Sequence, residues 1–138
     1  MALKDMESQM KEVVALPIQA ISSDTTTNGA AVDMQGYEAV TFLPVAGAVT
    51  DGDYTPLILE GDDSNVSNAS AVADADLLPS GTGQEASAAL DTANTASKIG
   101  YRGTKRYVFC SIVSANTASG ATVGVVGIQE CPSKAPVA

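Results

Sequence analysis

The residue types that carry most enzymatic chemistry are sparse in this 138-residue sequence. It contains no histidine, which removes Ser-His-Asp and Cys-His catalysis, the common zinc sites and the usual near-neutral general base. Its two cysteines, Cys110 and Cys131, do not have the spacing of a metal-ligand motif. The stretch GTGQEA at 81–86 matches part of a dinucleotide fingerprint, but no strand is predicted before it, so we interpret it as a loop. We therefore expect neither enzymatic activity nor a cofactor.

Acidic side chains gather in short turns, where their oxygen atoms could bind calcium. The turns are DGD at 51–53, EGDD at 60–63 and DAD at 74–76. None has the spacing of an EF-hand loop, which places acids at alternating positions and a Glu at the twelfth. Asp-Gly pairs are also the residues that tight turns use without any metal. We favour solubilising turn acids, and a structural calcium ion remains the alternative.

Charge is distributed unevenly along the chain. The net charge is −9, and no Lys or Arg occurs between Glu12 and Lys98. This excess of acid disfavours nucleic acid and anionic membranes as partners, because both attract proteins mainly through Lys and Arg. Four of the seven basic residues then follow closely on one another: Lys98, Arg102, Lys105 and Arg106.

This basic cluster is interleaved with two tyrosines. Arg and Tyr are enriched in the hot spots of protein interfaces, which favours a docking surface for another protein. An alternative stays open, in which the basic side chains only balance the local acidic field. The residues of the predicted interface are Lys98, Tyr101, Arg102, Lys105, Arg106 and Tyr107.

The elements that must position this cluster are mostly predicted strands. Apolar runs, several of them β-branched or aromatic, bounded by turn residues predict strands over 16–21, 36–46, 54–59, 105–114 and 121–129, with a short one at 71–72. Pro44 predicts a sheet edge or a bulge late in the second of these. Residues 64–97 are otherwise expected to form a long surface excursion. No 18-residue apolar run is present, so we expect no membrane-spanning helix. No signal peptide is recognisable either, so we expect free thiols in a reducing compartment.

Together these elements predict an all-β protein, a jelly-roll-like β-sandwich with a short N-terminal helix or arm. Apolar residues spaced three and four apart over residues 1–14 predict the helix. The predicted organisation is an N-terminal arm or helix at 1–15, a β-sandwich domain at 16–130 and a C-terminal tail at 131–138.

The strand at 105–114 is apolar on both faces. Val108, Cys110 and Ile112 project from one face, while Phe109 and Val113 project from the other. Such a strand is either central in the fold or exposes one face as an interface, and we favour the interface. Cys110 is expected to be a core cysteine.

Four segments of the chain resemble a known family. They are VDMQGYEAVTFLPVAGAVTDGDYTPLILEGDDS at 32–64, ADLLPS at 75–80, IGYRGTKRYVFCSIVSA at 99–115 and GATVGVVGIQECPSKAPVA at 120–138. The most specific pieces are the TDGxYTPxxxEGDDS run and the KRYV strand followed by GAxVG. These segments are similar to the capsid cement and decoration proteins of tailed phages, over nearly the whole predicted domain.

The resemblance implies a jelly-roll-like domain that dimerises on the outside of an icosahedral head and bridges major capsid subunits. It also implies synthesis in the host cytoplasm, which agrees with the expected free thiols. The basic cluster would then face the capsid or a partner copy. The alternative function is a head-surface decoration that binds host or environmental glycans, although the sequence has only four Tyr, two Phe and no Trp to stack on sugars.

Overall fold

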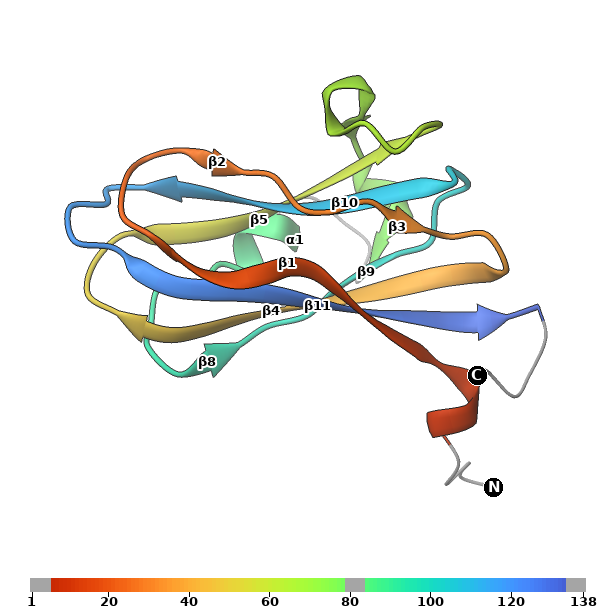
Figure 1. The fold of residues 1–138 in the computed structure, drawn as a ribbon, viewed down its shortest axis with the longest axis horizontal. Helices are drawn as coiled ribbons and strands as arrows, with labels where there is room; N and C mark the ends of the chain where they lie inside the picture. Colours follow the sequence, from red (N-terminus) through yellow and green to blue (C-terminus); the bar gives the residue numbers. More distant parts are fainter. Residues whose placement is uncertain (1–5, 79–83, 134–138) are drawn as a thin grey trace.

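The computed structural model describes residues 6–78 and 84–133, and it contains two antiparallel β-sheets packed face to face (Figure 1). The six-stranded sheet, called the large sheet here, has the order β1 (Lys11–Ile21), β11 (Ala121–Pro132), β4 (Tyr37–Val49), β9 (Ile99–Tyr101) and β7 (Leu77–Leu78), with β8 (Thr95–Ala96) paired to β4. The five-stranded small sheet has the order β2 (Thr26–Thr27), β10 (Tyr107–Ala115), β5 (Asp53–Gly61) and β6 (Ser70–Ala71), with β3 (Val32–Asp33) paired to β10.

The chain passes repeatedly between the two sheets. β1, β4, β7, β8, β9 and β11 belong to the large sheet, while β2 and β3, β5 and β6, and β10 belong to the small sheet. This alternation is that of a double-sheet jelly roll. The predicted all-β, jelly-roll-like sandwich is therefore confirmed. Among the described residues, no helix is long and apolar enough to cross a membrane.

The core lies between the sheets and is built from the alternating side chains of the long strands. Val40 and Phe42 of β4 and Cys110 and Ile112 of β10 all belong to it and are fully buried. Cys110 is a free thiol, and burial raises its pKa, so the predicted core cysteine is confirmed.

β10 lies in the interior of the small sheet, between β5 on one side and β2 and β3 on the other. Phe109, on the face opposite Cys110, is only 1% exposed in the single chain. Its apolar character therefore needs no partner protein, and the interface interpretation that we favoured for this strand is wrong for Phe109.

The N-terminal helix prediction is also wrong for Lys11–Val14, which begin a strand. Lys11–Ile21 forms β1, which pairs with β11, and only Glu7–Gln9 forms a helical turn, the 3-10 helix η1. Cross-strand pairing with β11 overrides the local helical spacing, because a short isolated helix is marginal in water. Residues 1–5 lie outside the described part of the chain. The predicted C-terminal tail begins inside β11, which continues to Pro132.

The expectation that Pro44 lies at a sheet edge needs correction. Pro44 lies opposite Val125 in β4, a strand with neighbours on both sides, and not at a sheet edge. The carbonyl of Pro44 accepts a hydrogen bond from Ser97 N, where the pairing of β4 passes from β9 to β8.

The excursion at 64–97 packs against the sandwich. It contains the 3-10 helices η2 (Val66–Asn68) and η3 (Asp74–Asp76), the short helix α1 (Gln84–Ser87) and strands β6 to β8. Leu77 and Leu90 in it are buried core residues. Residues 79–83, including part of the GTGQEA stretch, lie outside the described residues, and Gln84–Ala86 begin α1.

Candidate functional site

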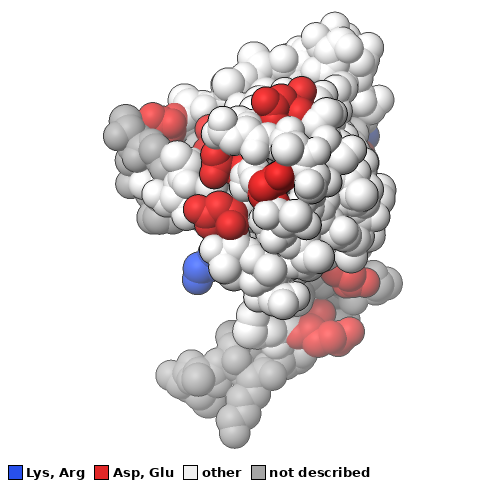
Figure 2. All heavy atoms as spheres, turned by 90° about the vertical axis from the view of Figure 1, so that its left-hand side faces the viewer, with Lys and Arg blue, Asp and Glu red and all other residues white. Residues whose placement is uncertain are grey.

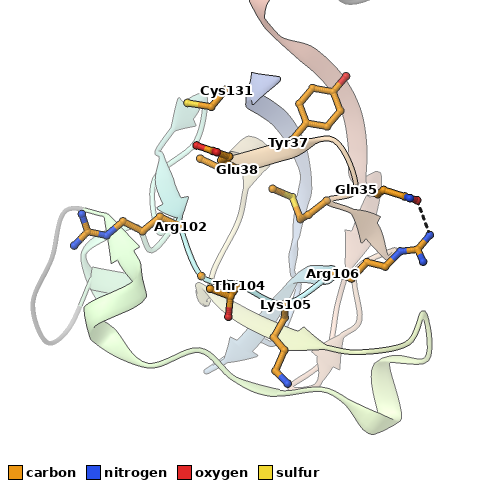
Figure 3. Close-up of a pocket in the computed structure, with 11 residues that line it drawn as sticks. Gln35, Tyr37, Glu38, Arg102, Thr104, Lys105, Arg106 and Cys131 are labelled. Carbon is orange, nitrogen blue, oxygen red and sulfur yellow. Dashed lines mark hydrogen bonds between the residues drawn. The ribbon is translucent and has the colours of Figure 1, made fainter. Parts of the chain in front are cut away.

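A pocket of about 780 Å³ opens at the end of the sandwich where β9 passes into β10 (Figure 3). One wall is the turn before β4 and the first residues of β4, the other is the loop at residues 102–106, and Cys131 at the end of β11 completes it. The lining residues are Met34, Gln35, Tyr37, Glu38, Ala39, Arg102, Gly103, Thr104, Lys105, Arg106 and Cys131.

Tyr101 anchors the loop that carries the basic residues. Its hydroxyl donates a hydrogen bond to Glu60 Oε2 at 2.6 Å and accepts one from Lys105 N at 3.2 Å. Burial and the Glu60 carboxylate raise the pKa of Tyr101. The loop wraps closely around the ring, since a Cβ at Gly103 would stand 2.6 Å from Tyr101 Cζ. Only glycine fits at that contact.

The prediction of Tyr101 as an interface residue is wrong. Its exposed fraction is 0%, because β9 lies within the large sheet and the side chain reaches Glu60 in the small sheet. The signal in the sequence was ambiguous, since a tyrosine among basic residues fits either an interface or a buried anchor with a satisfied hydroxyl.

Arg106 forms a bidentate ion pair with Asp33 of the same chain. Its Nε and Nη2 donate to the two carboxylate oxygens of Asp33 at 3.0 and 2.9 Å, and Nη2 also donates to Gln35 Oε1 at 3.0 Å (Figure 3). The guanidinium lies 5.0 Å from the centroid of the half-buried Tyr107 ring, a cation–π contact. The pair holds the pKa of Asp33 below its ordinary value. β3 and the turn after it are thereby tied to the start of β10.

Lys105 is paired in the same way with the EGDD turn. Its Nζ lies 2.9 and 3.1 Å from the carboxylate oxygens of Asp62, and this carboxylate raises the pKa of Lys105. Two of the four clustered basic residues thus neutralise acidic residues of the same chain. This supports the alternative left open above, that the cluster balances a local acidic field, for Lys105 and Arg106.

The two remaining basic residues, Arg102 and Lys98, differ in their position relative to the pocket. Arg102 lines the pocket, its Nη2 lies 3.5 Å from the Ala75 carbonyl, and Figure 3 shows its side chain extending away from Lys105 and Arg106. Lys98 is exposed between β8 and β9 and does not line the pocket. The structure therefore gathers Arg102, Lys105 and Arg106 around one pocket, and leaves Lys98 outside it.

Sequence analysis missed the opposite wall of the pocket. Met34, Tyr37 and Ala39 supply its apolar surface, and Glu38 supplies a carboxylate. The backbone ladder between β3 and β10 and the hydrogen bond from Met34 N to Arg106 O bring this wall against the basic loop. No local signal in the sequence reveals such long-range pairing. The arrangement offers charged donors beside an apolar floor, which suits binding to a protein surface.

The opposite end of the sandwich is acidic. Figure 2 shows carboxylates gathered over its loops. Asp51 accepts hydrogen bonds from the backbone N–H groups of Ala118, Ser119 and Gly120, at 2.9 to 3.1 Å, and these bonds lower its pKa. Nearby, Asp24 accepts from Thr117 N and Asp53 accepts from Asn116 Nδ2.

These carboxylates hold loops in place through hydrogen bonds. Within 6–78 and 84–133, no three or more His, Cys, Asp or Glu side chains are grouped so that they could hold a metal ion.

Comparison with known proteins gives only distant similarity. No protein-family model and no curated protein matches the chain. Among solved structures, the SPBc2 prophage-derived protein YomS is 14% identical, with a TM-score of 0.44, over 88% of this chain and 95% of that one. A structure of infectious bursal disease virus, Gx strain, is 17% identical, with a TM-score of 0.31, over 90% of this chain and 42% of that chain.

Proposed function

We propose that this chain is a non-enzymatic virion structural protein that binds the outside of an icosahedral phage head and cements major capsid subunits. It would be made in the host cytoplasm and assembled on the capsid exterior. The observation that carries this proposal is the pocket at one end of the sandwich, where the basic loop at residues 102–106 faces an apolar wall. The other end of the sandwich is acidic (Figure 2). Such an asymmetric surface favours docking in one orientation.

The family-like segments of the sequence contribute to this geometry directly. Asp62, in the TDGxYTPxxxEGDDS run, pairs with Lys105 of KRYV, and Asp51 in the same run accepts from Gly120 of GAxVG. The pieces that carry the resemblance therefore contact one another and hold the two ends of the sandwich. This supports a shared scaffold role for those residues. We place the capsid contact at the pocket, which Arg102 lines.

Multiple copies would make a modest contact sufficient. If one copy, or a pair of copies, bridges neighbouring capsid subunits, each attachment raises the effective concentration of the next. An acidic outward end would limit sticking between coated heads, because like charges repel. We assign the acidic end of Figure 2 to this outer surface.

The direct test is co-sedimentation with expanded capsids that lack the protein. Arg102→Glu is the informative variant, because it reverses a charge in the lining of the pocket and leaves the Lys105–Asp62 and Arg106–Asp33 pairs intact. Lys11→Glu in β1 is the matched control, since it changes the charge equally outside the pocket. We expect wild type and Lys11→Glu to pellet with capsids and Arg102→Glu to bind at least about tenfold more weakly.

Other outcomes would count against the proposal. Wild-type protein that stays in the supernatant would refute capsid binding, and Arg102→Glu binding like wild type would refute the pocket as the contact. Cementing itself predicts that decorated heads resist heat or osmotic shock better than bare heads. If the protein does not bind capsids but is retained on a glycan array, the decoration alternative is favoured. The aromatic side chain of Tyr37, which lines the pocket, could then stack on a sugar.

A further inference from the structure

A second surface lies on the outer face of the large sheet. Residues directly opposite each other in antiparallel strands project from the same face. Val14 of β1, Val126 of β11 and Leu43 of β4 form one such row, with Val13, Gly127 and Phe42 facing the core beside it. The row is aliphatic from end to end.

The neighbouring rows continue the apolar surface. Towards the acidic end, Gly124 lies opposite Val45, and Ile18 lies over Gly124 so closely that a Cβ there would be 2.6 Å from Ile18 Cγ1. Towards the other end, Ile128 lies opposite Thr41, which in turn lies opposite Gly100 with Leu78 beside it. The side chains that stand out most are Val14, Ile18, Val45 and Val126, at 59%, 76%, 40% and 38% exposed.

An apolar groove extends this face at its far end. It measures about 430 Å³ and is bordered by Met6 and Met10 from the N-terminal segment and by Ile128 of β11. The carboxylates nearest to the apolar rows are Glu12, opposite Ile128, and Glu130, which accepts a hydrogen bond from Thr41 Oγ1. Both lie at that end of the sheet, so the centre of the face carries aliphatic side chains without charge.

The family resemblance implies a dimer without saying where two copies meet. We propose that they meet on this outer face, centred on Val126, with sheet packed against sheet. The row through Val126 has an aliphatic neighbour on each side, Val14 and Leu43. A twofold axis near Val126 would therefore place aliphatic side chains against aliphatic side chains in both halves. That self-matching is what an isologous interface requires.

Charge and area also favour a second copy. Each chain carries a net charge of −9, so two copies repel each other least when the facing surfaces lack carboxylates, as the centre of this face does. β11 has 12 residues. At about 3.3 Å per residue and about 4.8 Å between strands, β1, β11 and β4 alone span roughly 570 Å². With β7, β8 and β9 the face comes to roughly 680 Å², within the roughly 600–1,000 Å² per partner of standard interfaces.

Pairing edge to edge is less favourable than pairing face to face. β1 is the outermost strand, but it contains Pro17, and its register against β11 shifts between Val14 and Leu16 and again between Leu16 and Gln19. A proline and such irregularities interrupt the ladder that an added strand would need. The face beside this edge is left as the available apolar surface.

The test uses the purified full-length chain alone, by sedimentation equilibrium across micromolar concentrations. Wild type should have twice the 13.9 kDa chain mass. Val126→Lys should weaken the dimer at least tenfold, because it places an ammonium group at the centre of the face. Thr26→Lys, at an exposed strand position of the small sheet, is the matched control and should remain dimeric. Thermal unfolding should show all three folded.

Each contrary result has a clear meaning. A wild-type chain that stays monomeric throughout, or a Val126→Lys dimer as tight as wild type, overturns the proposal. If Val126→Lys does not fold, Val45→Lys makes the same test from the neighbouring row. A monomeric wild type whose capsid binding is lost with Val126→Lys would instead assign the face to the capsid protein. Because the mass is measured without capsids, the proposal can fail while capsid binding stands, and the reverse.

Discussion

Several charged side chains of this protein contact distant parts of the same chain. Arg106 and Lys105 pair with Asp33 and Asp62, and Asp51 holds the loop before β11 through backbone N–H groups. Acidic turns from one part of the chain meet basic residues and bare amides from another, and the folded loops depend on these contacts.

The Asp51 contacts predict a specific dependence on pH. Backbone hydrogen bonds lower the pKa of Asp51 in the fold, so its ionised form stabilises the protein above its unfolded pKa, near 3.9. This stabilisation is lost as the pH falls through the lower folded value. We expect Asp51→Asn to be less stable than wild type at pH 7, with a difference that shrinks below about pH 4.

Urea unfolding between pH 2 and pH 7 measures this difference. Asp91→Asn is the control, because Asp91 is exposed and its described side-chain hydrogen bond is with adjacent Thr92. A difference between wild type and Asp51→Asn that stays constant across this range would contradict the assigned role of the carboxylate.

At the scale of elements, the segment at 84–90 closes one side of the sandwich. Glu85 Oε1 accepts a hydrogen bond from Ile58 N, and Leu90 N donates to Tyr54 O, both on β5. Ser97 Oγ donates to the Ala88 carbonyl, which links the same segment to the strands beside β4. The segment thus covers the edge of β5, which would otherwise expose unpaired backbone groups.

Leu90→Ala tests whether this segment is part of the core. Leu90 is 1% exposed, so its truncation should leave a cavity and lower the free energy of unfolding by about 2–5 kcal/mol. Thr92→Ala, at an exposed position two residues on, should change it by less than about 0.5 kcal/mol. Urea denaturation of both variants measures the effect. A loss below about 1 kcal/mol for Leu90→Ala would contradict the packing of this segment on β5.

At the scale of the whole molecule, the two associations that we propose use different surfaces. The proposed capsid contact is an exposed, charged pocket at one end, and the proposed self-contact is an uncharged apolar sheet face. The two should respond in opposite ways to salt. Screening shortens the reach of exposed charges from about 10 Å at 0.1 M to about 3 Å at 1 M salt. Burial of apolar area does not depend on charge.

We therefore expect capsid co-sedimentation to weaken several-fold between 0.1 and 1 M NaCl. Dimerisation should hold or strengthen, because salt also screens the repulsion between two chains of net charge −9. Parallel co-sedimentation and sedimentation equilibrium measurements at both salt concentrations test this. Equal weakening of both associations by salt would contradict the assignment of one contact to charged groups and the other to apolar burial.

Much of the fold was predictable because its signals are local. Alternating apolar residues and turn chemistry placed the strands around 36–46, 54–59, 105–114 and 121–129, and an all-β sandwich follows from them. The same local reasoning predicted a helix where Lys11–Val14 form β1, since helical spacing and strand propensity coincide in a short apolar run. Pairing with β11 settled that ambiguity, and pairing lies outside any local window.

The sequence by itself determined the composition of the surface, the core role of Cys110 and the cluster of basic residues. Only the tertiary structure decided what those basic residues contact. It buried Tyr101 against Glu60, paired Lys105 and Arg106 with acids far away in the chain, and placed Arg102 in the lining of the pocket, near the Ala75 carbonyl. The reason is physical: a charge has no fixed partner in a linear chain, and its partner depends on which turns the two sheets bring together.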